Sequence, residues 1–274
     1  MASVRPAAIA GMFYARDARV LALDVDGLMA AARVTTAPLP KAIIAPHAGY
    51  IYSGPVAASI YALIALARAR IKRVVLHGPT HRVTVHGMAL PGVNAFATPL
   101  GHVAIDGDNV KTLMAVPFVG VNAEAHRLEH SLGVQLPLLQ TILGGFMLTP
   151  LALERARSQQ VAEVIDRLLG GDKKLIVVSS DLSHYLPYAE AQTTDRATAQ
   201  AIVDLHSGID HQQACGATPV AGLNVVARQR GLGAKLIDLR DSGDTAGDKA
   251  RVAGYGSFAY YAQQPAAADG SRTH

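Results

Sequence analysis

The chain has 274 residues, half of them hydrophobic and only 17% charged, so it is long enough to bury a core and too apolar to be intrinsically disordered. Lys and Arg exceed Asp and Glu by four (25 against 21), a mild basic excess. The basic residues are scattered, with no aromatic ladder between them, which argues against nucleic-acid binding.

The single cysteine and the lack of long apolar runs indicate where the protein works. One cysteine excludes an intrachain disulfide framework and fits a reducing compartment. The N-terminus lacks the uninterrupted apolar region of a signal peptide, and no run approaches the roughly 20 apolar residues that span a bilayer. We therefore expect a cytoplasmic protein that does not enter a membrane.

Helices and strands are predicted to alternate along the first half of the chain. An Ala- and Leu-rich helix is expected over residues 17–32 and a short strand over 42–45. Residues 55–70 are predicted to be helical, with Pro55 near the first turn, where its missing N–H costs little. Further strands are predicted over 73–77, 83–90 and 101–105, and a helix over 106–114 with Asp106 as its N-cap.

The alternation continues to the end of the chain. Helices are predicted over 131–143 (with Ser131 as cap), 159–169, 189–205 and 219–229, and strands over 146–153, 175–179, 234–239 and 252–261. This order predicts a single α/β domain over residues 1–263, with a central mostly parallel or mixed β-sheet flanked by helices. The remaining residues, 264–274, are rich in small and polar side chains and are expected to be disordered.

Three predicted strands stop just before side chains that can bind a metal. His47 follows the first, His81 the second, and Asp181 with His184 the third. In an open α/β sheet, side chains just past the carboxyl ends of the strands line one crevice, so we expect these residues to converge. Together with the only thiol, Cys215, they would form either an N/O/S metal site or a nucleophile cluster.

Each of these residues also has a simpler interpretation. Asp181 and His184, three apart, suit a carboxylate that orients an imidazole, but Asp181 could equally be a helix N-cap. Cys215 precedes a predicted helix, where a thiol is activated, but a free cysteine is usually a small buried hydrophobe. His130 could be a fourth imidazole near the site, and Glu129 a surface carboxylate or a cap.

Several common fingerprints are absent from the sequence. There is no GxGxxG, GxxxxGK[ST], HExxH or GxSxG motif, so no dinucleotide or phosphate cradle is predicted. His77 ends a predicted strand and is equally well explained as a core histidine. The other histidines are assigned to the surface or to packing.

Several segments in order resemble the Memo family, whose bacterial members are grouped as protein B of the AmmeMemoRadiSam system. They are Arg5-Pro6 with Gly11-Phe13-Tyr14, Pro46-His47-Ala48-Gly49-Tyr50 with Tyr52-Ser53-Gly54, Gly78-Pro79-Thr80-His81, Glu129-His130-Ser131 with Gln135-Leu136-Pro137, Ser180-Asp181-Leu182-Ser183-His184-Tyr185, Cys215-Gly216 and Gly254-Tyr255-Gly256-Ser257. The resemblance covers residues 4–261. It implies a fold like that of class III extradiol ring-cleaving dioxygenases, which hold non-haem Fe(II) with two histidines and a carboxylate.

The resemblance also implies a set of site residues. The metal ligands fall on His47, His81 and Cys215, and Asp181 and His184 match residues that line the same cavity. A thiolate in place of the dioxygenase carboxylate puts ring cleavage in doubt and makes Fe(II), Cu or Zn the metals to consider. Gly133 departs from the family pattern, in which many relatives carry Glu.

Three functions remain open on the sequence. The first is a metal-dependent, dioxygenase-like oxidoreductase of unknown substrate, in which His184, oriented by Asp181, would act as acid/base. The second is a non-catalytic metal carrier or a scaffold that binds a peptide or partner protein. The third is a hydrolase with Cys215 as nucleophile, His184 as base and Asp181 as the residue that orients the base. A small-molecule or peptide ligand in the crevice is expected, and the family implies an association with a radical-SAM protein.

Overall fold

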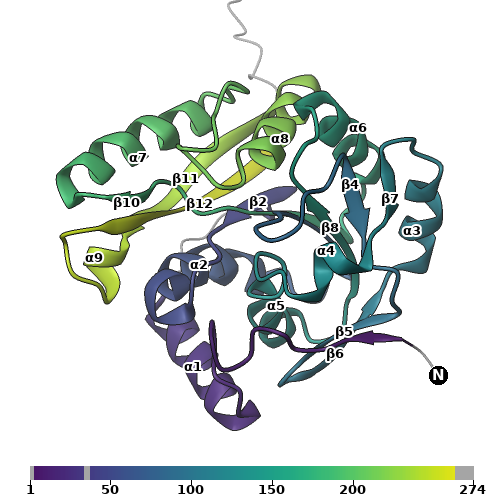
Figure 1. The fold of residues 1–274 in the computed structure, drawn as a ribbon, viewed down its shortest axis with the longest axis horizontal. Helices are drawn as coiled ribbons and strands as arrows, with labels where there is room; N and C mark the ends of the chain where they lie inside the picture. The colour runs from purple at the N-terminus through teal and green to yellow at the C-terminus, as the bar shows by residue number, and fades with distance from the viewer. Residues whose placement is uncertain (1–2, 34–37, 263–274) are drawn as a thin grey trace, which may run out of the picture.

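Four parallel strands form the centre of the sheet, in the order β8 (Met147–Leu153), β3 (Arg73–Pro79), β9 (Lys174–Ser179) and β2 (Ala42–Ala45). The computed structural model describes residues 3–33 and 38–262, and in this part of the chain the four strands belong to a mixed sheet of twelve (Figure 1). All four are nearly continuous apolar runs, because a parallel strand with helices on both faces is buried on both sides.

Strands of mixed direction extend this centre on both sides. Next to β8 lie β6 (Gly101–Ile105), β5 (Ala95–Thr98) and β1 (Val4–Arg5), in that order. Next to β2 lies the antiparallel β12 (Val252–Ala262), which also pairs with β11 (Leu232–Asp241) and β10 (His184–Leu186). The short β4 (Met88–Leu90) joins β7 (Val119–Val121) to β8.

Helices cover both faces of the sheet (Figure 1). One face packs on α1 (Ala18–Ala31), α2 (Tyr50–Ala65) and α5 (Gln135–Leu143), the other on α6 (Ser158–Leu168), α7 (Tyr188–Val203) and α8 (Ala217–Arg230). Smaller helices are α3 (Gly107–Met114), α4 (Ala123–Arg127) and α9 (Ser242–Thr245). Because side chains alternate along a strand, Val74 and Leu76 of β3 enter the first core and Val75 enters the second.

The predicted fold class is confirmed: the chain forms a single-domain α/β fold with a large mixed sheet flanked by helices. Asp106, the predicted cap, accepts a backbone N–H group of the first turn of α3, and Asp17 does the same for α1. The tail over residues 264–274, predicted to be disordered, lies outside the described residues.

Other predicted boundaries were wrong. Helix α2 begins at Tyr50, directly after the His47 loop, so Pro55 lies inside the helix and not in its first turn. Helix α5 begins only at Gln135, because the Ser131 hydroxyl donates to the Pro79 carbonyl and does not cap the helix. Only residues 88–90 of the predicted strand 83–90 pair in the sheet, and β5 forms where a loop was predicted.

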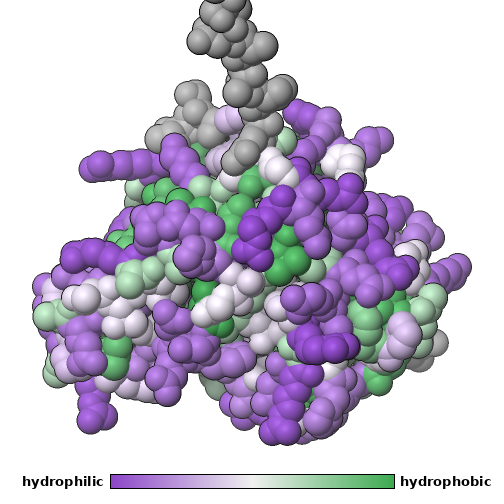
Figure 2. Space-filling view, turned by 90° about the horizontal axis from the view of Figure 1, so that it is seen from above, coloured by the Kyte–Doolittle hydropathy of each residue, from purple (hydrophilic) through white to green (hydrophobic). Residues whose placement is uncertain are grey.

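The surface is consistent with the composition. Within the described ranges, no helix combines the length and apolar character needed to cross a membrane. Seen from the side of α7 and α8, the molecule is mainly hydrophilic, with hydrophobic residues gathered near the middle of that face (Figure 2).

Candidate metal centre

The carboxyl ends of β3, β9 and β2 bring three predicted site residues together. His81, Asp181 and His47 are each the second residue beyond their strand, and β9 lies between the other two strands. The His47 and His81 rings lie 5.4 Å apart, centroid to centroid. The Asp181 Oδ1 atom accepts the backbone N–H of His47 at 2.6 Å. The predicted convergence at one crevice is therefore present in the fold.

A third imidazole, His130, joins His47 and His81. Each histidine has one ring nitrogen in this group, and the three nitrogens all lie within 4.8 Å of one another. His130 reaches the strands from the turn before α5, which packs closely on β3 because Gly78 has no side chain: a Cβ there would lie 2.7 Å from Ser131 Oγ. Burial lowers the pKa of His130 to about 4, so its ring is neutral at neutral pH.

The hydrogen bonds of His47 assign its tautomer. The Ser179 hydroxyl donates to the Ser131 carbonyl at 2.7 Å, so its oxygen acts as acceptor for His47 Nδ1–H at 2.9 Å. The Gln135 amide donates to the same oxygen at 2.8 Å. Burial, with the neighbouring His130 and His81, holds the pKa of His47 well below its usual value. His47 is therefore a neutral imidazole whose Nε2 lone pair is free for a ligand.

His81 is fixed by the carboxylate of Glu129, which is buried and lies neither at the surface nor in a cap as predicted. Glu129 is 2% exposed and accepts both the backbone N–H and Nδ1–H of His81. It also accepts the backbone N–H groups of His130 and Ser131. Burial by itself raises the pKa of Glu129, but the hydrogen bond from His81 and the further contacts lower it to about 2. The carboxylate is thus ionised, and His81 keeps Nε2 for a ligand.

Cys215 lies against His47, in the loop before α8. Its Sγ atom is 3.2 Å from His47 Nε2 and accepts the backbone N–H of Asp181, also at 3.2 Å. Burial, and next the Asp181 carboxylate, raise the pKa of the Cys215 thiol. Among the described residues, the group within 4.8 Å comprises the three histidines and not Cys215. A separation of 3.2 Å nevertheless lies inside the roughly 4.4 Å that the bonds of one zinc ion to nitrogen and sulfur can span.

Asp181 and His184 do not form the predicted hydrogen-bonded pair. The Asp181 Oδ2 and His184 Nε2 atoms are 4.0 Å apart, beyond hydrogen-bond range. Asp181 is not a helix cap either, because it holds the His47 loop through the backbone bond described above. His184 is the first residue of β10, and its side chain is 37% exposed at the rim of the site.

The loop that carries Asp181 and His184 is held by residues that the sequence analysis did not identify. The Asp195 carboxylate on α7 is buried and accepts the backbone N–H of Ser183 at 3.0 Å. Gly254 of β12 accepts from Leu182 and donates to Ser183 through its backbone. The sequence offers no signal for Asp195, because it lies within a long helix. For Glu129, the only sequence signal of a place near the site was the adjacent His130.

Gly133, the departure from the family pattern, lies beside Arg5. A Cβ at this position would be 3.0 Å from Ile9 Cδ1 and 3.5 Å from Arg5 Nη1. Arg5 is buried and donates to the carbonyls of His126 and Glu129. A longer side chain at position 133 would therefore contact Arg5, which holds the turn that carries Glu129.

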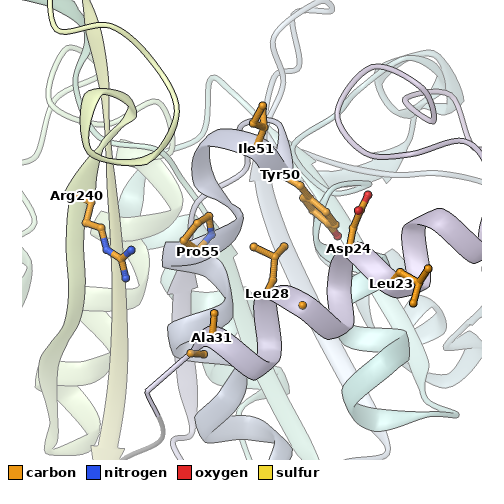
Figure 3. A pocket seen from close by; sticks show the side chains of 10 residues that line it. Leu23, Asp24, Leu28, Ala31, Tyr50, Ile51, Pro55 and Arg240 are labelled. Carbon is orange, nitrogen blue, oxygen red and sulfur yellow. The ribbon is translucent and has the colours of Figure 1, made fainter.

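A separate cavity of about 620 Å³ lies between α1, α2 and β11. In Figure 3, Leu28 and Pro55 lie between Arg240 of β11 on one side and Asp24 of α1 on the other. Leu23 and Ile51, which also line it, are 72% and 69% exposed. None of its described lining residues belongs to the histidine group.

Fold and site together define an α/β protein with a histidine-rich candidate metal centre at the carboxyl ends of its parallel strands. The model of the family "Memo-like protein" matches residues 5–259. The chain therefore belongs to the Memo-like family, as its motifs predicted.

Named relatives agree with this assignment, and a solved structure shares the fold. A "MEMO1 family protein" of Aquifex aeolicus is 35% identical over 92% of this chain and 97% of that protein, and one of Aeropyrum pernix is 36% identical over 78% and 81%. The crystal structure of uncharacterized protein JW3007 from Escherichia coli K12 covers 80% of this chain and 99% of its own, with a TM-score of 0.50 and 14% identity. That likeness concerns the fold alone.

The donors present fit a transition metal. Imidazole nitrogens and a thiol suit zinc, copper and iron, whereas magnesium and calcium prefer sites built from oxygen. Each of His47 and His81 has its Nδ1 engaged by a buried oxygen, the outer contact that metal-binding histidines usually have. We therefore regard the residues as compatible with the metal that the family implies.

Proposed function

We propose that the chain binds a transition metal, Fe(II) in the first place and Cu or Zn as alternatives, through His47, His81 and Cys215. The observation that carries the proposal is the orientation of the two imidazoles. Buried acceptors hold both Nδ1 atoms, and the free Nε2 of His47 meets the Cys215 sulfur at 3.2 Å. Such orientation before binding lowers the entropy cost of holding an ion.

We further propose that the site serves a metal-dependent oxidoreductase of dioxygenase-like type. A bound iron or copper would supply one-electron chemistry and an open position for a small ligand. His184, exposed at the rim, would exchange a proton with a substrate entering from solvent. Asp181 would support the site through the backbone of His47 and the sulfur of Cys215, and not by hydrogen bonding to His184.

The hydrolase hypothesis has little support in the geometry. The imidazole next to Cys215 is His47, which is fixed by Ser179, and not His184. Burial also raises the pKa of the thiol, which favours the less nucleophilic protonated form.

The alternative function is a metal carrier or a scaffold for a partner. The 4.0 Å gap between Asp181 and His184 favours it, because an acid/base residue is usually oriented by a hydrogen bond. The cavity bordered by the exposed Leu23 and Ile51 offers an apolar surface away from the metal residues. For either function, we propose a small-molecule or peptide ligand in the crevice and a functional association with a radical-SAM protein. We also propose a cytoplasmic location, which the single cysteine supports.

Metal analysis of anaerobically purified protein tests the proposal. Iron, copper and zinc would be quantified in the wild type, in His47→Ala and in Cys215→Ser, with His102→Ala, which alters an exposed histidine, as control. We expect near-stoichiometric metal in the wild type and the control, and a loss in the two site variants. Metal-free wild type that also fails anaerobic Fe(II) reconstitution would exclude the proposal. Metal that binds without any O₂-dependent turnover in a substrate screen would favour the carrier.

A further inference from the structure

We propose that His130 is a third imidazole ligand of the metal centre, in addition to His47 and His81. The inference rests on the metal binding proposed above. The family resemblance assigns no ligand role to this residue, and the sequence places it only near the site.

The distances within the histidine group carry the inference. The His130 ring centroid lies 4.3 Å from that of His81 and 5.4 Å from that of His47, and the three ligand nitrogens lie within 4.8 Å of one another. Nitrogens bound to one zinc ion in tetrahedral geometry lie about 3.4 Å apart, because each bond is about 2.1 Å long. The nitrogens of the group therefore need to approach one another by up to about 1.4 Å to hold one ion. His184 is not a member of this group.

The contacts of His130 fix its ring in this position. Phe13 stacks on it with the two ring planes 19° apart and the centroids at 4.5 Å. The His130 Nδ1 atom lies 3.3 Å from Glu129 Oε1, and the backbone N–H of His130 donates to the same oxygen at 2.8 Å. Because Nδ1 faces the carboxylate, Nε2 is the nitrogen left for an ion. Glu129 thus serves two imidazoles, His81 and His130, with one carboxylate.

If His130 served only to fill space in the core, its ring would not need to lie beside those of His47 and His81. A histidine that only fills space needs no second imidazole at 4.3 Å. The Nε2 of His47 faces the Cys215 sulfur, but bringing the neutral rings of His81 and His130 together leaves their lone pairs without a donor among the described residues. A shared ion satisfies all three lone pairs at once. Three imidazoles and the Cys215 sulfur would then give the ion four protein donors, a set that suits zinc, copper or iron.

The test uses the full chain and zinc ions, which are silent in redox chemistry. Binding of Zn²⁺ would be measured by competition with a chromophoric chelator, and the histidine ring nitrogens would be followed by long-range ¹H–¹⁵N correlation spectra. The main variant is His130→Phe, which keeps the stack on Phe13 but removes the donor. His130→Cys restores a donor, and His184→Ala removes an imidazole outside the group as the matched control.

We expect three rings with a zinc-shifted nitrogen in the wild type and two in His130→Phe, with affinity reduced roughly 10-fold or more. His130→Cys should regain part of the affinity, and His184→Ala should keep both the affinity and the three signals. Zinc bound through His47 and His81 with His130→Phe unchanged would overturn this inference and leave the metal proposal intact. Wild type that binds no zinc, iron or copper would overturn both. Melting of the metal-free variants shows whether each is folded.

Discussion

Glu129 and His81 are joined twice, by two different atoms of each residue. The Oε2 atom of the carboxylate accepts the His81 backbone N–H at 2.6 Å, and Oε1 accepts Nδ1–H at 2.9 Å. The first bond sets the course of the chain beyond β3, and the second sets the rotation of the ring. A single buried carboxylate therefore fixes both the position and the tautomer of a proposed ligand.

Replacing Glu129 by Gln should weaken metal binding. The amide can accept only with its oxygen, so one of the two bonds to His81 is lost and a buried NH₂ group meets an N–H donor. We expect Zn²⁺ or Fe(II) affinity to fall about 10–100-fold, the usual effect of losing such a partner. Glu163→Gln, which alters a surface ion pair with Arg167, is the control. Equal affinity of Glu129→Gln and wild type would contradict the assigned role.

Ser179→Ala should affect both stability and the site. The substitution leaves His47 Nδ1–H and the Gln135 amide without their shared acceptor inside the core. We expect unfolding free energy to fall by about 1–3 kcal/mol and metal affinity to fall with it. Chemical denaturation and chelator competition measure the two effects, and Ser179→Thr, which keeps the hydroxyl, should retain more of the affinity than Ala. If Ala kept wild-type affinity, His47 would not need this tautomer.

Cys215→Ser should change metal preference more than fold. Serine keeps a polar atom near His47 Nε2 and the Asp181 N–H but replaces a soft donor by a hard one. With Co²⁺ as probe, we expect the wild type to show a thiolate-to-cobalt charge-transfer absorption that the variant lacks. An identical cobalt spectrum in both proteins would place the sulfur outside the coordination sphere.

The stability of the protein should fall at acidic pH partly because of His77. This residue of β3 is fully buried on the same face as Val75, and neither ring nitrogen has a partner in the described structure. Burial lowers the pKa of His77 to about 3, from 6.5, so the unfolded chain binds the proton more strongly than the folded one. Stability from this group is complete above pH 6.5 and is lost as the pH falls toward 3.

We expect His77 to account for about 2 kcal/mol of destabilisation between pH 8 and pH 5. His77→Leu should flatten the dependence of unfolding free energy on pH by that amount, whereas His102→Leu, at an exposed position, should not. Denaturant unfolding at several pH values gives the comparison. Parallel curves for wild type and His77→Leu would show that His77 titrates normally.

Gly254 and Asp195 should be energetically coupled. A Cβ at Gly254 would lie 1.9 Å from Asp195 Oδ2, so Gly254→Ala forces the carboxylate away from the Ser183 N–H. We expect each single change, Gly254→Ala and Asp195→Ala, to destabilise the fold. The double variant should cost less than their sum by about 0.5–3 kcal/mol, because the clash is gone once the carboxylate is removed. Additive effects in denaturant unfolding would contradict this contact.

The sequence was most informative where a local pattern has a structural meaning. The apolar runs before His47, His81 and Asp181 identified the strands and the edge on which these residues lie, because buried parallel strands are apolar throughout. Family motifs added Cys215, whose loop does approach His47. Helix starts were less well predicted, since Pro55 and Ser131 suit a first turn but are used elsewhere.

The amino-acid sequence by itself determined the α/β class, the strands that end at the site and the residue types available there. Only the tertiary structure decided that β9 lies between β2 and β3. It also decided that the buried Glu129 contacts the rings of both His81 and His130, and that Asp181 bonds to His47 and not to His184. The physical reason is the range of the interactions. Periodicity and capping act over a few residues, whereas sheet order and side-chain hydrogen bonds join residues far apart in the chain and form only when the core packs.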